Sequence, residues 1–93
     1  MANQVYFVEN VETGRIKVGF TDGSVTQRVA SLQTGSDAQL RLLGVIPALS
    51  GEGTTELQLH RRLRRFHYRG EWFGRDAYTM IRELLEKDWK WPT

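Results

Sequence analysis

The chain has no cysteine among its 93 residues. This absence excludes disulfides, thiol nucleophiles and every zinc or iron site with cysteine ligands. Any metal must therefore bind oxygen or imidazole groups. Proline is scarce as well: Pro47 and Pro92 are the only two, and both fall outside the interiors of the expected helices and strands.

Long apolar runs are missing too. The first apolar stretch is interrupted at Glu9 and has no basic segment before it, so the N-terminus has the pattern of neither a signal peptide nor a membrane span. We therefore expect no membrane partner and a cytoplasmic location. With 40% hydrophobic and 26% charged residues, the composition is that of an ordinary globular protein. The length predicts one domain over residues 1–93.

Periodicity and turn residues predict three strands and three helices. The strands are expected at residues 5–10, 16–20 and 40–46, the last of them mostly buried. The helices are expected at about 25–34, about 53–66 and from Asp76 onward. Trp72 and Phe73 are expected to close the core at the sheet edge. The predicted order of elements is β-β-α-β-α-α.

The first two strands predict a hairpin whose faces can be sorted. If Thr13 and Gly14 form a two-residue loop, Tyr6 and Lys17 emerge on the same face of the sheet. Gly19 lies between them and has no side chain. We therefore expect open space at Gly19, through which a substrate can approach the sheet.

The segment from Glu56 to Arg69 carries the densest set of charged groups. Glu56 and His60 are four residues apart, so on a helix they share a face beside an apolar stripe. The residues that follow, up to position 69, contain no acid and five arginines: Arg61, Arg62, Arg64, Arg65 and Arg69. An acid, an imidazole and arginines together indicate binding or hydrolysis of a phosphate group. A run of arginines is also typical of a solvated helix face.

Short motifs follow one another in a recognisable order along most of the chain. They are V-Y-F at 5–7, K-V-G-F-T at 17–21, Arg28, L-R-L-L-G-V-I-P at 40–47, E-L-Q-L-H at 56–60 and G-E-W-F at 70–73. In this order they resemble the GIY-YIG nucleases, in particular a small phage and bacterial branch similar to the phage T5 DNA-binding domain proteins. The joint spacing is more specific than any one motif. The resemblance implies an α+β fold with a three-stranded antiparallel sheet flanked by helices.

The resemblance also implies roles for single residues. Tyr6 matches the first active-site tyrosine, Arg28 the phosphate-binding arginine and Glu56 the metal-binding glutamate. The implied reaction is hydrolysis of DNA phosphodiester bonds with one divalent metal, Mg²⁺ or Mn²⁺. Two positions depart from the family pattern: no glycine precedes Tyr6, and Lys17 stands where the second signature tyrosine would be.

Lys17 and His60 complete the expected catalytic set. The Lys17 ammonium would favour the phenolate of Tyr6, or would hold a phosphate or the attacking water. His60 would form a surface pair with Glu56, hold its carboxylate, donate a proton to the leaving oxygen or, least favoured, bind zinc. We expect the five candidate catalytic residues to converge on one shallow cleft. They are Tyr6, Lys17, Arg28, Glu56 and His60.

These patterns predict a DNA-binding, metal-dependent endonuclease whose arginines contact the duplex backbone. The main alternative is a noncatalytic DNA-binding module of the same fold. A third and weaker alternative is a protein-interaction domain whose arginines meet an acidic partner. A requirement for divalent metal distinguishes the first two alternatives, because a nuclease needs the metal for turnover and a binding module does not.

Overall fold

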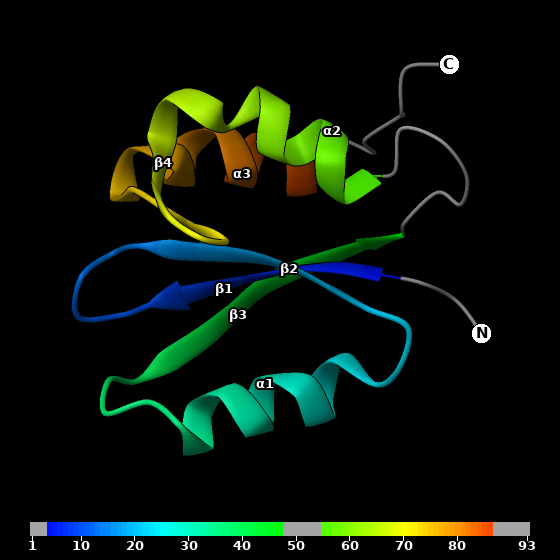
Figure 1. The fold of residues 1–93 in the computed structure, drawn as a ribbon, viewed down its shortest axis with the longest axis vertical. Coiled ribbons are helices and arrows are strands. Elements are labelled where there is room, and N and C mark those ends of the chain that lie inside the picture. Colours follow the sequence, from blue (N-terminus) through cyan, green and yellow to red (C-terminus); the bar gives the residue numbers. More distant parts are fainter. Residues whose placement is uncertain (1–3, 48–54, 87–93) are drawn as a thin grey trace.

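The computed structural model describes residues 4–47 and 55–86, with side chains from residue 59 onward in the second range. The strands are β1 (Gln4–Asn10), β2 (Ile16–Thr21), β3 (Leu40–Pro47), β4 (His67–Arg69) and β5 (Trp72–Phe73). The helices are α1 (Val25–Thr34), α2 (Thr55–Arg62) and α3 (Tyr78–Glu86), with short 3-10 turns η1 (Arg64–Phe66) and η2 (Arg75–Ala77). The sheet lies between α1 on one face and the pair α2 and α3 on the other (Figure 1).

The sheet has five antiparallel strands in the order β3-β1-β2-β5-β4. The predicted three-stranded sheet and the order β-β-α-β-α-α are therefore wrong. The difference lies in β4 and β5, which form a small hairpin around Gly70 and extend the sheet because Ile16 pairs with Phe73 and Lys17 with Trp72. Strands of three and two residues are too short for a periodic pattern that would distinguish them from a loop.

The turn of the β1–β2 hairpin is longer than expected. The backbone N–H of Asn10 donates to the Arg15 carbonyl at 2.8 Å and closes the turn. The predicted two-residue loop is wrong because the Asn10 side chain accepts hydrogen bonds from the N–H groups of Glu12 and Thr13, which stabilises a wider turn. The observed pairing of β1 with β2 differs from the predicted pairing by an even number of residues. The side chains therefore keep their predicted faces.

Apolar side chains form a separate core on each face of the sheet. The larger core lies under α2 and α3 and includes Val5, Phe7, Ile16, Val18, Leu59, Leu63, Phe73 and Ile81. The smaller core lies under α1 and consists of Tyr6, Val8 and Val25, with partly buried neighbours. Because α1 packs mainly against β1 and β3, the β5–β4 end of that face is left more exposed.

Two details of burial differ from the sequence analysis. β3 is an edge strand, and Leu42 is 40% exposed, so the mostly buried strand expected there is wrong. Phe73 is in the core as predicted, but Trp72 points to the opposite face and is only half-buried. These two neighbours separate because successive side chains of a strand alternate between its faces.

The helices follow the prediction more closely. α1 covers the predicted range, and its N-cap Ser24 accepts a hydrogen bond from the Gln27 N–H at 3.2 Å. α2 ends at Arg62, before the predicted end at 66, and the separate 3-10 turn η1 continues to Phe66; the predicted start near residue 53 lies outside the described residues. α3 begins at Tyr78, after η2 rather than directly at the predicted cap. Within the described residues, no helix is long and apolar enough to cross a membrane.

Candidate nucleic-acid interface

Tyr6 lies in the core beneath α1 rather than in an open cleft. Its side chain is 3% exposed and packs in the cluster with Val8 and Val25. Tyr6 pairs with Gly19 across the hairpin, and a Cβ atom built on Gly19 would collide with the Tyr6 ring. The expected open space at Gly19 is therefore wrong, because the tyrosine ring itself occupies it.

Lys17 emerges on the same face of the sheet as Tyr6, as the hairpin pattern predicted. Its ammonium forms an ion pair with Glu71, with 3.2 Å between Nζ and Oε1, and lies 5.9 Å from the centre of the Trp72 ring. β2 thus directs Lys17 toward the added β5 strand, where a carboxylate and an aromatic face balance its charge.

Arg28 lies in the first turn of α1, beside an open hollow of about 270 Å³ that we call the Arg28 hollow. Its lining is mostly polar and includes Thr21, Asp22, Ser24, Gln27, Arg28 and Ser31. The Thr21 hydroxyl accepts a hydrogen bond from the Gly23 N–H at 3.1 Å, which holds the turn before the helix. A guanidinium beside hydroxyl groups is a donor set suited to a phosphate.

Glu56 and His60 belong to α2, which covers the other face of the sheet (Figure 1). The Glu56 side chain lies outside the described residues, and its backbone is in the first turn of the helix. The His60 ring meets the ring of Phe73 edge-on, with 5.2 Å between their centres, and Phe73 belongs to the larger core. His60 therefore lies across the sheet from Tyr6.

The expected single cleft is consequently not formed by the described side chains. Tyr6, Lys17 and Arg28 lie on or beside the α1 face of the sheet, whereas α2 carries Glu56 and His60 on the opposite face. The two groups share one end of the molecule, because the first turns of α1 and α2 both lie at the end of the sheet where β2 finishes (Figure 1).

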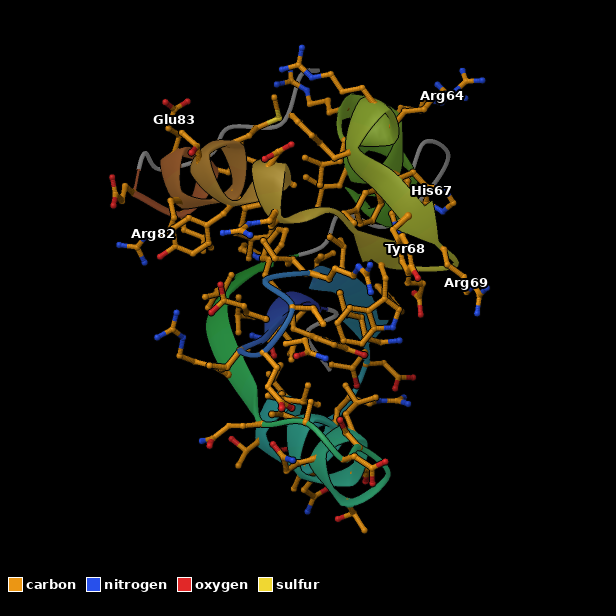
Figure 2. All side chains as sticks on the ribbon, turned by 90° about the vertical axis from the view of Figure 1, so that its left-hand side faces the viewer. Arg64, His67, Tyr68, Arg69, Arg82 and Glu83 are labelled. Carbon is orange, nitrogen blue, oxygen red and sulfur yellow. The ribbon has the colours of Figure 1, made fainter. Side chains whose placement is uncertain are left out.

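The arginine cluster, which comprises Arg61, Arg62, Arg64, Arg65 and Arg69, occupies α2, η1 and β4. All five side chains are exposed. Figure 2 shows Arg64 and Arg69 extending outward on one side of the molecule, with Arg82 and Glu83 on the other. The Arg65 guanidinium also lies 4.7 Å from the centre of the Phe66 ring. The cluster therefore presents several guanidinium groups to solvent along a continuous segment.

Sequence analysis missed a group of aromatic and basic side chains at the β5–β4 end of the sheet. The Arg15 guanidinium lies 3.7 Å from the centre of the Tyr68 ring. Both residues line a second hollow of about 190 Å³ together with Asn10, Thr13 and Trp72. The signal available in the sequence was Gly70 between two short aromatic segments, which is a hairpin pattern; in the structure this glycine has a φ of +55°.

Among the described residues, no three His, Asp or Glu side chains gather in a group that could hold a metal ion. No protein-family model matches the chain, and no match was found among curated proteins or solved structures. The likeness to the GIY-YIG nucleases therefore depends on the order of motifs in the sequence.

Proposed function

We propose that this protein binds double-stranded DNA and contacts its phosphate backbone through the arginine cluster. The observation that carries the proposal is the exposure of all five arginines on one continuous segment. Guanidinium groups bind phosphate oxygens in a bidentate fashion. Each phosphate that they neutralise releases condensed counterions, which supplies affinity without any base-specific contact.

The position of Tyr6 makes the noncatalytic module the first choice over the nuclease. A general base must reach the water that it activates, but Tyr6 is 3% exposed and its ring covers Gly19. The Lys17 ammonium, which was expected to favour the phenolate, is paired with Glu71. Binding through the exposed arginines requires neither of these groups.

Hydrolysis of the bound DNA is the second candidate function. It is favoured by the polar Arg28 hollow and by the placement of the first turns of α1 and α2 at the same end of the sheet. A single glutamate suits Mg²⁺ or Mn²⁺ at a phosphodiester, because Mg²⁺ keeps several waters and takes further ligands from the substrate phosphate. Glu56 would hold that ion, which would supply charge neutralisation at the scissile phosphate.

Duplex binding is tested by fluorescence anisotropy with a labelled duplex at several salt concentrations. If about four arginines contact phosphates, the slope of log K against log salt is roughly −3.5, or about a hundredfold loss of affinity between ~50 and ~200 mM salt. A slope near zero would contradict the proposal. It would favour the interaction domain, in which the arginines meet an acidic protein surface.

Hydrolysis is tested separately on supercoiled, linear, branched and single-stranded DNA with Mg²⁺ and with Mn²⁺. The noncatalytic module leaves every substrate intact while still binding duplex. Cleavage that appears only with the divalent ion and is lost in Glu56→Ala would establish the second candidate. Glu83→Ala is the matched control, because it removes an exposed carboxylate of α3 (Figure 2).

A further inference from the structure

The hollow beside Tyr68, named here the hairpin hollow, lies between the two hairpins of the sheet. Its lining consists of Asn10, Thr13, Arg15, Tyr68 and Trp72. These residues come from the β1–β2 turn and from the β4–β5 hairpin, which meet because β5 pairs with β2. α1 packs on β1 and β3 instead, so the hollow remains open to solvent in the part of the chain that the structure describes.

The aromatic rings at this hollow are paired with cations rather than buried in a core. Tyr68 is 51% exposed, and Arg15 places its guanidinium 3.7 Å from the ring centre. Lys17 lies near Trp72. Figure 2 shows Tyr68 and Arg69 together on β4, on the opposite side of the molecule from Arg82. The exposed ring and the guanidinium against it form a planar surface on which another planar group can stack.

Planar rings with adjacent cations can bind a nucleotide, because the rings can stack on the base and the cations can contact the phosphate. Bases stack on tyrosine and tryptophan rings and on guanidinium planes, while lysine and arginine hold the backbone. Asn10 adds a hydrogen-bonding group: its Oδ1 accepts from two backbone N–H groups, so its NH₂ group is the end that can donate to a base. In a duplex the base faces are stacked on one another, and such a hollow therefore requires an unpaired base.

We infer that the hairpin hollow receives an unpaired base of a single-stranded nucleic acid segment. The base stacks against the pair formed by Tyr68 and Arg15, and a flanking phosphate lies toward Arg69. An acidic protein surface fits less well, because a carboxylate has no planar ring that could stack on the exposed Tyr68 side chain. The inference does not depend on hydrolysis, and it adds single-stranded segments to the proposed duplex ligand.

The test compares Tyr68→Leu with Tyr68→Phe by anisotropy on a labelled oligothymidylate of about 12 nucleotides, within the range of known single-strand site sizes. Leucine removes the aromatic face, so single-strand affinity should fall about tenfold, whereas phenylalanine keeps the face and should bind like the wild type. Leu42→Ala, at the other edge of the sheet, is the control for a lost exposed apolar side chain and should change nothing.

A blunt duplex of the same length, measured with the same variants, separates this inference from the proposed function. Tyr68→Leu should leave duplex affinity within about twofold of the wild type, because phosphate contacts dominate that affinity. Equal single-strand affinity of Tyr68→Leu and the wild type would overturn the inference. So would equal weakening of single strand and duplex, or competition by thymidine monophosphate as effective as that by the oligonucleotide.

Discussion

At the scale of single residues, contacts across the sheet decide what each expected side chain can do. Tyr6 and Gly19 illustrate this. Open space was expected at Gly19, but Tyr6 pairs with this glycine and its ring fills the space. Glycine is required at position 19 for packing, and its presence alone is no sign of a substrate path.

Gly19→Ala should lower the free energy of unfolding by about 1–3 kcal/mol, the usual cost of forcing an extra methyl group into a packed site. The reason is the collision of the new Cβ with the Tyr6 ring. Urea denaturation measures the change. Gly23→Ala is the matched control, because a Cβ there would meet only the Thr21 hydroxyl at 3.8 Å. Equal stability of both variants would contradict the observed ring position.

The arginine cluster makes a second prediction for single residues. Replacing Arg64 and Arg65 with alanine should make the salt slope of duplex binding shallower by about 1.8, because each lost phosphate contact removes about 0.9. Anisotropy titrations at several salt concentrations measure the slope. Arg82→Ala should leave it unchanged, since Arg82 lies on the other side of the molecule (Figure 2) and pairs with Glu86. Identical slopes for the double variant and the wild type would exclude these two contacts.

At the scale of elements, the β4–β5 hairpin accounts for most of the differences between the predicted and the observed surroundings of the candidate residues. It moves Trp72 from the expected core to an exposed face and places Tyr68 beside Arg15. It also gives Lys17 a carboxylate partner in Glu71. Two very short strands therefore determine the surroundings of residues far away in the sequence.

This hairpin depends on its turn. Gly70 has a φ of +55°, and a Cβ there would meet no atom within 4 Å, so substitution would cost backbone strain alone. Gly70→Val should destabilise the protein by about 1–2 kcal/mol, and Gly70→Asn by much less, because asparagine tolerates the left-handed region. Thermal or urea unfolding compares the pair. Equal losses for valine and asparagine would show that another feature of the turn is responsible.

At the scale of the whole molecule, the sheet separates two sets of candidate groups. The α1 face carries Tyr6 and Lys17, with Arg28 on the helix beside it, whereas α2 carries Glu56 and the arginine cluster on the opposite side. Tyr6, Lys17 and Arg28 therefore lie apart from the arginine cluster, whereas Glu56 shares α2 with Arg61 and Arg62. The proposed roles of Glu56 and of the arginines in DNA binding must be separated by substitution.

Glu56→Ala should leave the dissociation constant for duplex DNA within about twofold of the wild type, since arginine–phosphate contacts supply the affinity. Arg64→Ala combined with Arg65→Ala should weaken the same binding severalfold. The two variants are compared by anisotropy at one salt concentration without divalent metal. A large loss of affinity in Glu56→Ala would mean that this glutamate supports the binding surface itself.

The sequence by itself determined the elements that have strong local signals. The helix at 25–34 has an N-cap serine and apolar spacing, and the alternation of the first two strands was enough to assign Phe7 and Tyr6 to opposite faces. The exposed arginines also follow from sequence, because a dense run of like charges cannot be buried. These properties depend on neighbouring residues, so they need no knowledge of distant contacts.

Only the tertiary structure decided the number of strands and the surroundings of the candidate site. β5 is a two-residue strand that is defined by its pairing with Ile16 and Lys17, and such pairing joins residues far apart in the chain. The same holds for Tyr68 over Arg15, for Tyr6 over Gly19 and for the opposite placement of α1 and α2. The local sequence pattern does not show which faces of the strands and helices pack together. The same pattern is compatible with several tertiary arrangements, and long-range packing selects one of them.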